Sequence, residues 1–274
     1  MIQDIFPHTF KNEFLPNQQI QEEDYVFCFH QNNVLLKKNG DEFEIPLKKD
    51  IGTVDSTVFL FILNEKPCFW IIDEIALPSN EFVYHDVTSY QSFQQKELDW
   101  STMVAMQLKN WYERNRYCGK CGTPTTMREE ERALVCSSCK HTVYPQIAPA
   151  IIVAIFCNDK LLLAHNTNFP EGFYSLVAGY VDVGESIEDA VRREVREEVG
   201  IQIKNIRYYK SQPWPYSGSM MIGFLADADE GQIIKVDNKE IEHADWYSRD
   251  NLPNHPHTRS IAGEIIEKFV NREL

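Results

Sequence analysis

The stretch GYVDVGESIEDAVRREVREEVGI, residues 179–201, decides the fold of the second half of this chain. Ser186 is a candidate N-cap, and Asp189 stands three residues later, where a capping box needs it. Gly200 stands where a helix ends on a left-handed residue. Between these signals, apolar residues recur at helical spacing, at Ile187, Ala190, Val191, Val195 and Val199. The pattern predicts a glycine-containing turn followed by an amphipathic helix.

The same helix carries three glutamates on one face. Glu194, Glu197 and Glu198 stand at positions i, i+3 and i+4, which are neighbours on a helix surface. Because like charges repel, the cluster is explained if a divalent cation lies between the carboxylates. Carboxylate oxygens suit Mg²⁺, Mn²⁺ or Ca²⁺ better than Zn²⁺. A solvated acidic face is the simpler interpretation of a bare E-x-x-E-E, but the preceding turn and the spacing argue against it here.

The whole segment fits the pattern G-x₅-E-x₇-R-E-U-x-E-E-x-G-U, in which U is apolar. It resembles the Nudix box, the signature of hydrolases that cleave a nucleoside diphosphate linked to another group. The resemblance implies that the three glutamates are catalytic and bind divalent metal, with the carbonyl of Ala178 as a further ligand. It also implies that Arg193 pairs with Glu185 and orders the loop. The catalytic domain is then expected to be a Nudix α/β/α sandwich.

Upstream of this segment, four cysteines form two C-x-x-C pairs with the spacing C-x₂-C-x₁₄-C-x₂-C. They are Cys118, Cys121, Cys136 and Cys139. The spacing is typical of a zinc ribbon, because each pair brings two thiolates to one point and two pairs complete a tetrahedral Cys₄ shell. A closed shell leaves no position for water, so we expect structural Zn²⁺. A redox site would need only one pair.

Downstream of the helix lies SQPWPYSGS, residues 211–219. It resembles the S-Q-P-W-P-F-P-x-S array of NADH pyrophosphatases, a family also known as NAD-capped RNA hydrolases. That family has the same layout of an N-terminal domain, a Cys₄ ribbon and a Nudix domain. The array is therefore expected to bind substrate through Gln212, Pro213, Trp214, Pro215, Tyr216, Ser217, Gly218 and Ser219.

The residue types in this array fit a nucleotide pocket. Trp214 and Tyr216 offer flat faces for stacking, while Gln212 and Ser219 offer hydrogen bonds. The two prolines stiffen what we expect to be a loop. A proline-rich turn with a core tryptophan is the simpler interpretation of the P-W-P motif alone. Tyr216 and Ser217 replace the family's Phe and Pro. Tyr180 replaces a Phe of the box and is expected to stack on the substrate.

Four further residues match the family by resemblance alone, one as a metal ligand and three as substrate contacts. Glu240 resembles an additional metal-binding glutamate, although a surface glutamate is its simpler interpretation. The positions expected to contact substrate are Glu131, Tyr144 and Ala262.

Strand and helix signals extend the prediction to the rest of the chain. Aromatic and β-branched segments predict strands at Tyr25–His30, Thr57–Leu63 and 68–72. Helical spacing predicts a helix over 99–114 with Ser101 as its N-cap.

After the ribbon, apolar segments predict a hairpin at 148–157 and 161–165, strands at 203–209 and 219–226, and a last helix over about 258–270. We therefore expect an α+β protein with a β-rich N-terminal domain at 1–115, a zinc ribbon at 116–143 and a Nudix domain at 144–274.

The composition limits the partners. Of 274 residues, 27 are Lys or Arg and 41 are Asp or Glu, so the net charge of −14 argues against a protein that coats a nucleic acid backbone. It does not exclude an enzyme that grips one end of a nucleotide. No apolar run is long enough to cross a membrane, and the first residues do not read as a signal peptide. Paired cysteines indicate a reducing compartment, so a cytoplasmic protein without membrane partners is expected.

The resemblance implies hydrolysis of NAD(H) to nicotinamide mononucleotide and AMP, removal of NAD caps from RNA 5′ ends, catalysis with Mg²⁺ or Mn²⁺, and a homodimer. Two alternatives stay open. One is a Nudix hydrolase that prefers another nucleoside diphosphate, such as ADP-ribose. The other is a non-catalytic sensor of NAD or nucleic acid built on the ribbon.

Overall fold

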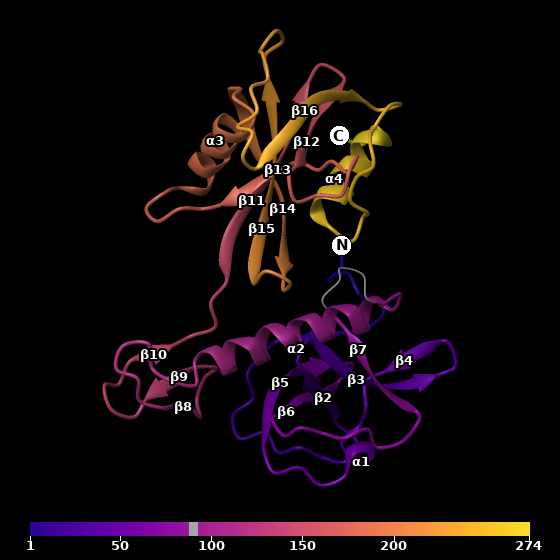
Figure 1. The fold of residues 1–274 in the computed structure, drawn as a ribbon, viewed down its shortest axis with the longest axis vertical. Coiled ribbons are helices and arrows are strands. Elements are labelled where there is room, and N and C mark those ends of the chain that lie inside the picture. Colours follow the sequence, from indigo (N-terminus) through magenta and orange to yellow (C-terminus); the bar gives the residue numbers. More distant parts are fainter. Residues whose placement is uncertain (88–92) are drawn as a thin grey trace. The chain divides into compact units, whose positions relative to one another are not determined.

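The computed structural model describes residues 1–87 and 93–274, which form two compact units (Figure 1). One unit is Ile2–Gln146, and the other is Ile147–Leu274 together with Met1. The cysteine ribbon therefore belongs to the same unit as the β-rich part of the chain. Among the described residues, no helix combines the length and the apolar character needed to cross a bilayer.

The first unit is built on a seven-stranded sheet in the order β1-β5-β6-β2-β3-β4, with β7 paired to β3. Its strands are β1 (Phe10–Lys11), β2 (Tyr25–His30), β3 (Asn33–Asn39), β4 (Glu42–Glu44), β5 (Thr57–Leu63), β6 (Lys66–Ile71) and β7 (Phe82–Asp86). Strands β2 and β6 pair in parallel, and the other pairs are antiparallel. The three predicted strands are confirmed as β2, β5 and β6.

Two helices accompany this sheet, the short α1 (Lys48–Ile51) and the long α2 (Lys96–Arg114). The predicted N-cap of α2 is wrong, because the helix begins earlier and Gln95 occupies the cap position. Ser101 lies inside the helix, fully buried, with its hydroxyl donating to the carbonyl of Leu98 at 3.3 Å. Burial of Leu98 and Trp100 extends the helix beyond the start that its capping signal indicated.

The ribbon follows α2 as a small antiparallel sheet in the order β10-β9-β8. Its strands are β8 (Thr125–Met127), β9 (Leu134–Cys136) and β10 (Thr142–Val143). Arg132 joins this sheet to the larger one, because its guanidinium donates to the side chain of Asn12 at 2.8 Å and to the carbonyl of Leu60. These bonds explain why the ribbon and the β-rich part form one unit.

The second unit contains a six-stranded sheet in the order β14-β15-β11-β12-β16, with β13 paired to β11. Its strands are β11 (Ala148–Cys157), β12 (Lys160–Asn166), β13 (Val177–Tyr180), β14 (Ile203–Trp214), β15 (Ser219–Ala228) and β16 (Ile241–Ser248). The predicted hairpin joins β11 to β12, and Asn158 turns it with a φ of 53°. Strands β11 and β15 pair in parallel.

Two helices, α3 (Ile187–Glu198) and α4 (Ile261–Val270), cover opposite faces of this sheet (Figure 1). The buried residues of β11 alternate between two cores. Ile151, Val153 and Ile155 pack in the core that includes α3, while Ile152 and Ala154 pack in the core that includes α4. This alternation confirms the predicted α/β/α sandwich.

Local signals set the bounds of both helices. The hydroxyl of Ser186 accepts a hydrogen bond from the backbone N–H of Asp189 at 3.2 Å, and Gly200 has a φ of 71° after the last turn of α3. Both predictions are confirmed. Helix α4 begins later than predicted, because Ser260 is its N-cap and accepts from the N–H of Gly263.

Candidate functional site

Arg193 on α3 organises the loop between β13 and α3. Its Nε and Nη2 donate to the two carboxylate oxygens of Glu185 at 2.8 and 2.9 Å. Nη2 also donates to the carbonyl of Tyr180 at 2.9 Å. Such two-pronged ion pairs are among the stronger hydrogen-bonded contacts in proteins. The pair raises the pKa of Arg193, lowers the pKa of Glu185 and holds the loop against the helix.

Glu194 lies directly against the backbone of Gly179. A Cβ atom at position 179 would stand 2.1 Å from the carboxyl carbon of Glu194, so any side chain there would displace the carboxylate. Nη1 of Arg193 donates to the same carboxylate at 2.8 Å. Burial, ahead of all other effects, raises the pKa of Glu194. Ala178, the predicted carbonyl ligand, precedes Gly179 in β13.

Glu198 is the most buried carboxylate of the set, with 6% of its surface exposed. Its Oε2 atom is buried and has no hydrogen-bond partner among the described residues. Burial, followed by the negative charges of Glu194 and Glu240, raises the pKa of Glu198 to about 8. An unpartnered buried carboxylate oxygen costs free energy in the absence of a compensating group. A divalent cation is such a group, so Glu198 fits a metal ligand.

Glu197 and Glu240 complete the predicted ligand set at the exposed side. Glu197 is 55% exposed and accepts from Arg193 at 3.3 Å. Glu240 is exposed, and its charge acts on both Glu194 and Glu198. The loop that carries Glu240 is ordered by Asp237, a residue to which the sequence assigned no role. The carboxylate of Asp237 accepts from the backbone N–H groups of Glu240 and Ile241 at 3.2 and 2.9 Å.

The donor set therefore fits a hard divalent cation. All four predicted side chains are carboxylates, which suit Mg²⁺ or Mn²⁺. Their oxygens lie farther apart than they would in a complete coordination shell. Within residues 1–87 and 93–274, the four cysteines alone form a group of three or more candidate ligand atoms within 4.8 Å of one another. Mutual repulsion and the grip of Arg193 on two of the glutamates explain the looser arrangement.

The array at 211–219 forms the tip of a β-hairpin. The expectation of a loop is wrong for its first half, since Ser211–Trp214 belongs to β14 and pairs with Ser219–Ile222 of β15. Pro213 is tolerated there because β14 is an edge strand. The turn closes at Gly218, with a φ of 70°.

Aromatic rings and hydroxyls gather at this tip. The rings of Trp214 and Tyr216 stand 5.1 Å apart at 48°. Tyr180 as a residue is 55% exposed, and its hydroxyl lies 3.3 Å from that of Ser219. The hydroxyl of Ser219 lies 2.7 Å from that of Ser217. The tip of the hairpin and the start of the loop before α3 are thus joined by a chain of three hydroxyls.

Two predicted substrate contacts lie in the interior. Gln212 is completely buried, and its amide donates to the carbonyl of Arg259 and accepts from the N–H of Ile261, at 2.8 and 2.7 Å. Its side chain thus holds the start of α4 against the hairpin. Ala262 belongs to α4 and is buried in the core between that helix and the sheet. Direct contact of either residue with a substrate stays a prediction.

The two predicted contacts in the first unit lie together. The hydroxyl of Tyr144 donates to the carboxylate of Glu131 at 3.0 Å, and Arg128 donates to the same oxygen. The Trp111 indole N–H donates to the carbonyl of Tyr144 at 3.1 Å and fixes its backbone. The role of this pair toward a substrate stays a prediction.

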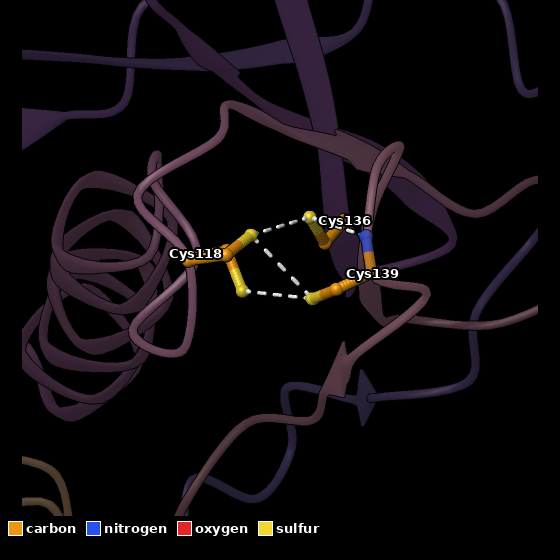
Figure 2. A group of neighbouring side chains, drawn as sticks. Cys118, Cys136 and Cys139 are labelled. Atoms are coloured by element: carbon orange, nitrogen blue, oxygen red, sulfur yellow. Dashed lines mark hydrogen bonds between the residues drawn. The ribbon is translucent and has the colours of Figure 1, made fainter.

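The four cysteines converge on one point, as Figure 2 shows for Cys118, Cys136 and Cys139. Sulfur–sulfur distances of 3.5 to 3.6 Å join Cys118 to Cys139 and Cys121 to Cys136 and Cys139. Each C-x-x-C pair forms the same tight turn. The carbonyls of the first cysteines accept from the N–H groups of residues 122 and 140, both of which are left-handed. Four thiols in this arrangement fit a tetrahedral zinc site.

Two protein families match this chain. The NUDIX domain matches residues 147–269, and the NADH pyrophosphatase zinc ribbon domain matches residues 113–144. The NAD-capped RNA hydrolase NudC of Klebsiella pneumoniae (strain 342) is 48% identical over 165 residues. That of Escherichia coli (strain SMS-3-5 / SECEC) is 46% identical over the same length. Each alignment covers 60% of this chain and 64% of the relative, so the chain matches somewhat less than two thirds of each relative.

Among solved structures, a NUDIX hydrolase from Nitrosomonas europaea aligns with a TM-score of 0.49 and 18% identity. The alignment covers 58% of this chain and 92% of that chain.

Proposed function

We propose that this chain, which carries a Nudix domain behind an NADH pyrophosphatase zinc ribbon, is a metal-dependent hydrolase of NAD(H) and of NAD caps at RNA 5′ ends. The products from the dinucleotide would be nicotinamide mononucleotide and AMP. The observation that carries the proposal is the buried, unpartnered carboxylate oxygen of Glu198 beside further carboxylates. The names of the relatives, which are NAD-capped RNA hydrolases, support the choice of substrate.

The carboxylates supply the metal site in this proposal. Glu194, Glu197, Glu198 and Glu240, with the carbonyl of Ala178, would hold Mg²⁺ or Mn²⁺. When bound, such an ion neutralises the diphosphate and makes a water molecule a better nucleophile. Arg193 holds the loop through Glu185 and restrains Glu194 and Glu197, so the carboxylates are oriented before the substrate arrives.

The hairpin tip supplies the aromatic part of the substrate site. Trp214 and Tyr216 stack on a ring of the dinucleotide, and Tyr180 stacks from the side of the metal loop. The hydroxyl of the exposed Ser217, already joined to that of the buried Ser219, offers a hydrogen bond to a ribose or amide group. Electrostatic stabilisation of the charge that develops on the pyrophosphate during cleavage provides most of the rate acceleration.

The ribbon holds Zn²⁺ in a structural role, because four thiolates leave no open position for a water molecule. A cytoplasmic homodimer, with Glu131 and Tyr144 contacting substrate, completes the proposal. This part is supported by the resemblance to NADH pyrophosphatases.

The test compares four substrates side by side in Mg²⁺ and in Mn²⁺: NADH, NAD⁺, ADP-ribose and a short NAD-capped RNA. We expect NADH and the capped RNA to be cleaved with kcat/KM at least about 10-fold above that for ADP-ribose. Glu198→Gln, purified in parallel, controls for contaminating hydrolases. Preference for ADP-ribose would move the assignment to another Nudix activity. Metal binding without any turnover would favour the sensor.

A further inference from the structure

The first unit contains an open groove of about 770 Å³ that none of the proposed chemistry uses. It lies between the end of α2, the ribbon hairpin and strands β5 and β6 of the larger sheet. Trp70 and Tyr112 are largely buried in its wall, with ring centroids 6.1 Å apart and planes at 31°. Tyr117 also lines it and is 62% exposed. The groove has the size of a pocket that holds one or two nucleotides.

One uncompensated positive charge lines this groove. Its carboxylate, Glu113, is neutralised by Lys109 at 2.7 Å. Arg116 also lines the groove. Its guanidinium is exposed and has no hydrogen bond or ion pair in the part of the chain that the structure describes. Of the ionisable side chains that line the groove, Arg116 alone is therefore left uncompensated, in a chain whose net charge is −14. This local charge therefore attracts anions to one place on an otherwise acidic protein.

We propose that this groove binds the single-stranded RNA that follows the cap, and this inference rests on the proposed function. Proteins bind single-stranded nucleic acids with aromatic rings and cations side by side, because the bases stack on the rings and the phosphates interact with the positive charge. Tyr117 offers an exposed face for stacking, and Arg116 offers a free guanidinium one residue away. Tyr117 directly precedes Cys118, and the carbonyl of Arg116 accepts from the N–H of Thr125 at 3.0 Å, so the ribbon fixes their place.

Free NADH lacks the RNA nucleotides that would occupy this groove. The groove therefore discriminates capped RNA from NADH without touching the cleaved bond, and its variants separate the two substrates. Arg116→Glu should lower kcat/KM for a capped RNA of about ten nucleotides by about 10-fold or more, and should leave NADH within about two-fold. Loss of one phosphate contact should also reduce the salt dependence by about one unit of log–log slope.

Tyr117→Ala should lower kcat/KM for the same RNA by about 5- to 100-fold, the range of one base–aromatic stack, and Tyr117→Phe should restore it. Lys38→Glu is the matched control, because Lys38 is exposed in the same unit, does not line the groove and changes the net charge equally. An RNA defect in the groove variants no larger than that of Lys38→Glu would overturn the proposal.

Direct binding separates this inference from the proposed function. Fluorescence anisotropy with an uncapped single-stranded RNA of ten nucleotides needs no turnover, and Arg116→Glu should weaken that binding even if the protein cleaves none of the four substrates. Light scattering gives the mass of each variant. A change of oligomeric state in Arg116→Glu or Tyr117→Ala would identify the groove as a contact between copies of the chain and would overturn RNA binding.

Discussion

The two candidate metal sites are built in opposite ways. In the ribbon, all four sulfur atoms lie within 4.8 Å of one another. On α3, the carboxylates approach one another less closely, and Arg193 donates to two of them. The cysteines come from two tight turns, and the glutamates come from one helix and a separate loop. In the ribbon, backbone turns already place the ligand atoms close together. On the helix, the carboxylates need a bound cation to balance their negative charge.

The difference follows from the ligands. Thiols ordinarily carry less charge at neutral pH than carboxylates, so they can pack together before metal binds, and backbone turns hold them at that distance. Carboxylates are ordinarily charged at neutral pH, and burial, followed by the charges of the neighbouring carboxylates, raises the pKa of the most buried member, Glu198, to about 8. A structural site gains from being preformed. A catalytic site must accept and release a charged substrate, and an incomplete cage leaves room for this.

The largest expected effect breaks the ribbon. Cys136→Ser removes a completely buried ligand, and structural zinc contributes on the order of 10 kcal/mol to the folding of such modules. We expect the zinc content to fall from one ion per chain to near zero and the unfolding transition of the first unit to be lost. Metal analysis and calorimetry measure both. Cys157→Ser, outside the cluster, should keep the zinc.

The next effect breaks the carboxylate site. Glu198→Gln keeps the shape of the side chain and removes its charge, so kcat/KM for NADH should fall by about 10³-fold. Its circular dichroism spectrum should be unchanged. Glu188→Gln, an exposed change on the same helix, is the matched control and should stay within about two-fold of the parent. Turnover near the parent level in Glu198→Gln would contradict the metal assignment.

The carboxylate site, unlike the ribbon, should make the stability of the metal-free protein depend on pH through Glu198. With the pKa of Glu198 raised from 4.5 to about 8, the folded metal-free chain keeps a proton that the unfolded chain releases. Stability should therefore fall as pH rises from about 4.5 to 8, by an amount on the order of a few kcal/mol. Thermal unfolding of the metal-free protein at pH 5, 6.5 and 8 measures this.

Two comparisons assign that slope to the site. Glu198→Gln should flatten it, whereas Glu188→Gln should not. Mg²⁺ at pH 8 should raise the midpoint of the parent, because the cation stabilises the ionised carboxylates. An equal slope in parent and Glu198→Gln would show that other groups govern the pH response.

The smallest effect concerns the residue that orients the carboxylates. Arg193→Gln removes the bonds to Glu185, Tyr180 and Glu194, so kcat/KM for NADH should fall by about 10- to 100-fold. The neighbouring Arg192→Gln changes the charge equally but removes only exposed contacts, with Asp189 and with the carbonyl of Glu188. Steady-state kinetics of the two variants should separate them, and equal losses would show that charge alone matters.

Local signals predicted some elements completely. Helix α3 begins after Ser186 and ends before Gly200 because a hydroxyl cap and a left-handed glycine act within one turn of the chain. Strand β7 was missed, since its partner β3 lies about fifty residues away in the sequence. Helix α2 was predicted to begin too late because burial, and not a cap, sets its start.

The sequence by itself determined which residues can bind metal, because ligand type and spacing are properties of the chain. It also determined α3, whose bonds are local. Only the tertiary structure decided that Oε2 of Glu198 is buried without a partner, that Gln212 serves the start of α4, and that Arg116 and Tyr117 border an aromatic groove. Burial and electrostatic environment depend on residues far apart in the chain, so only the folded protein specifies them.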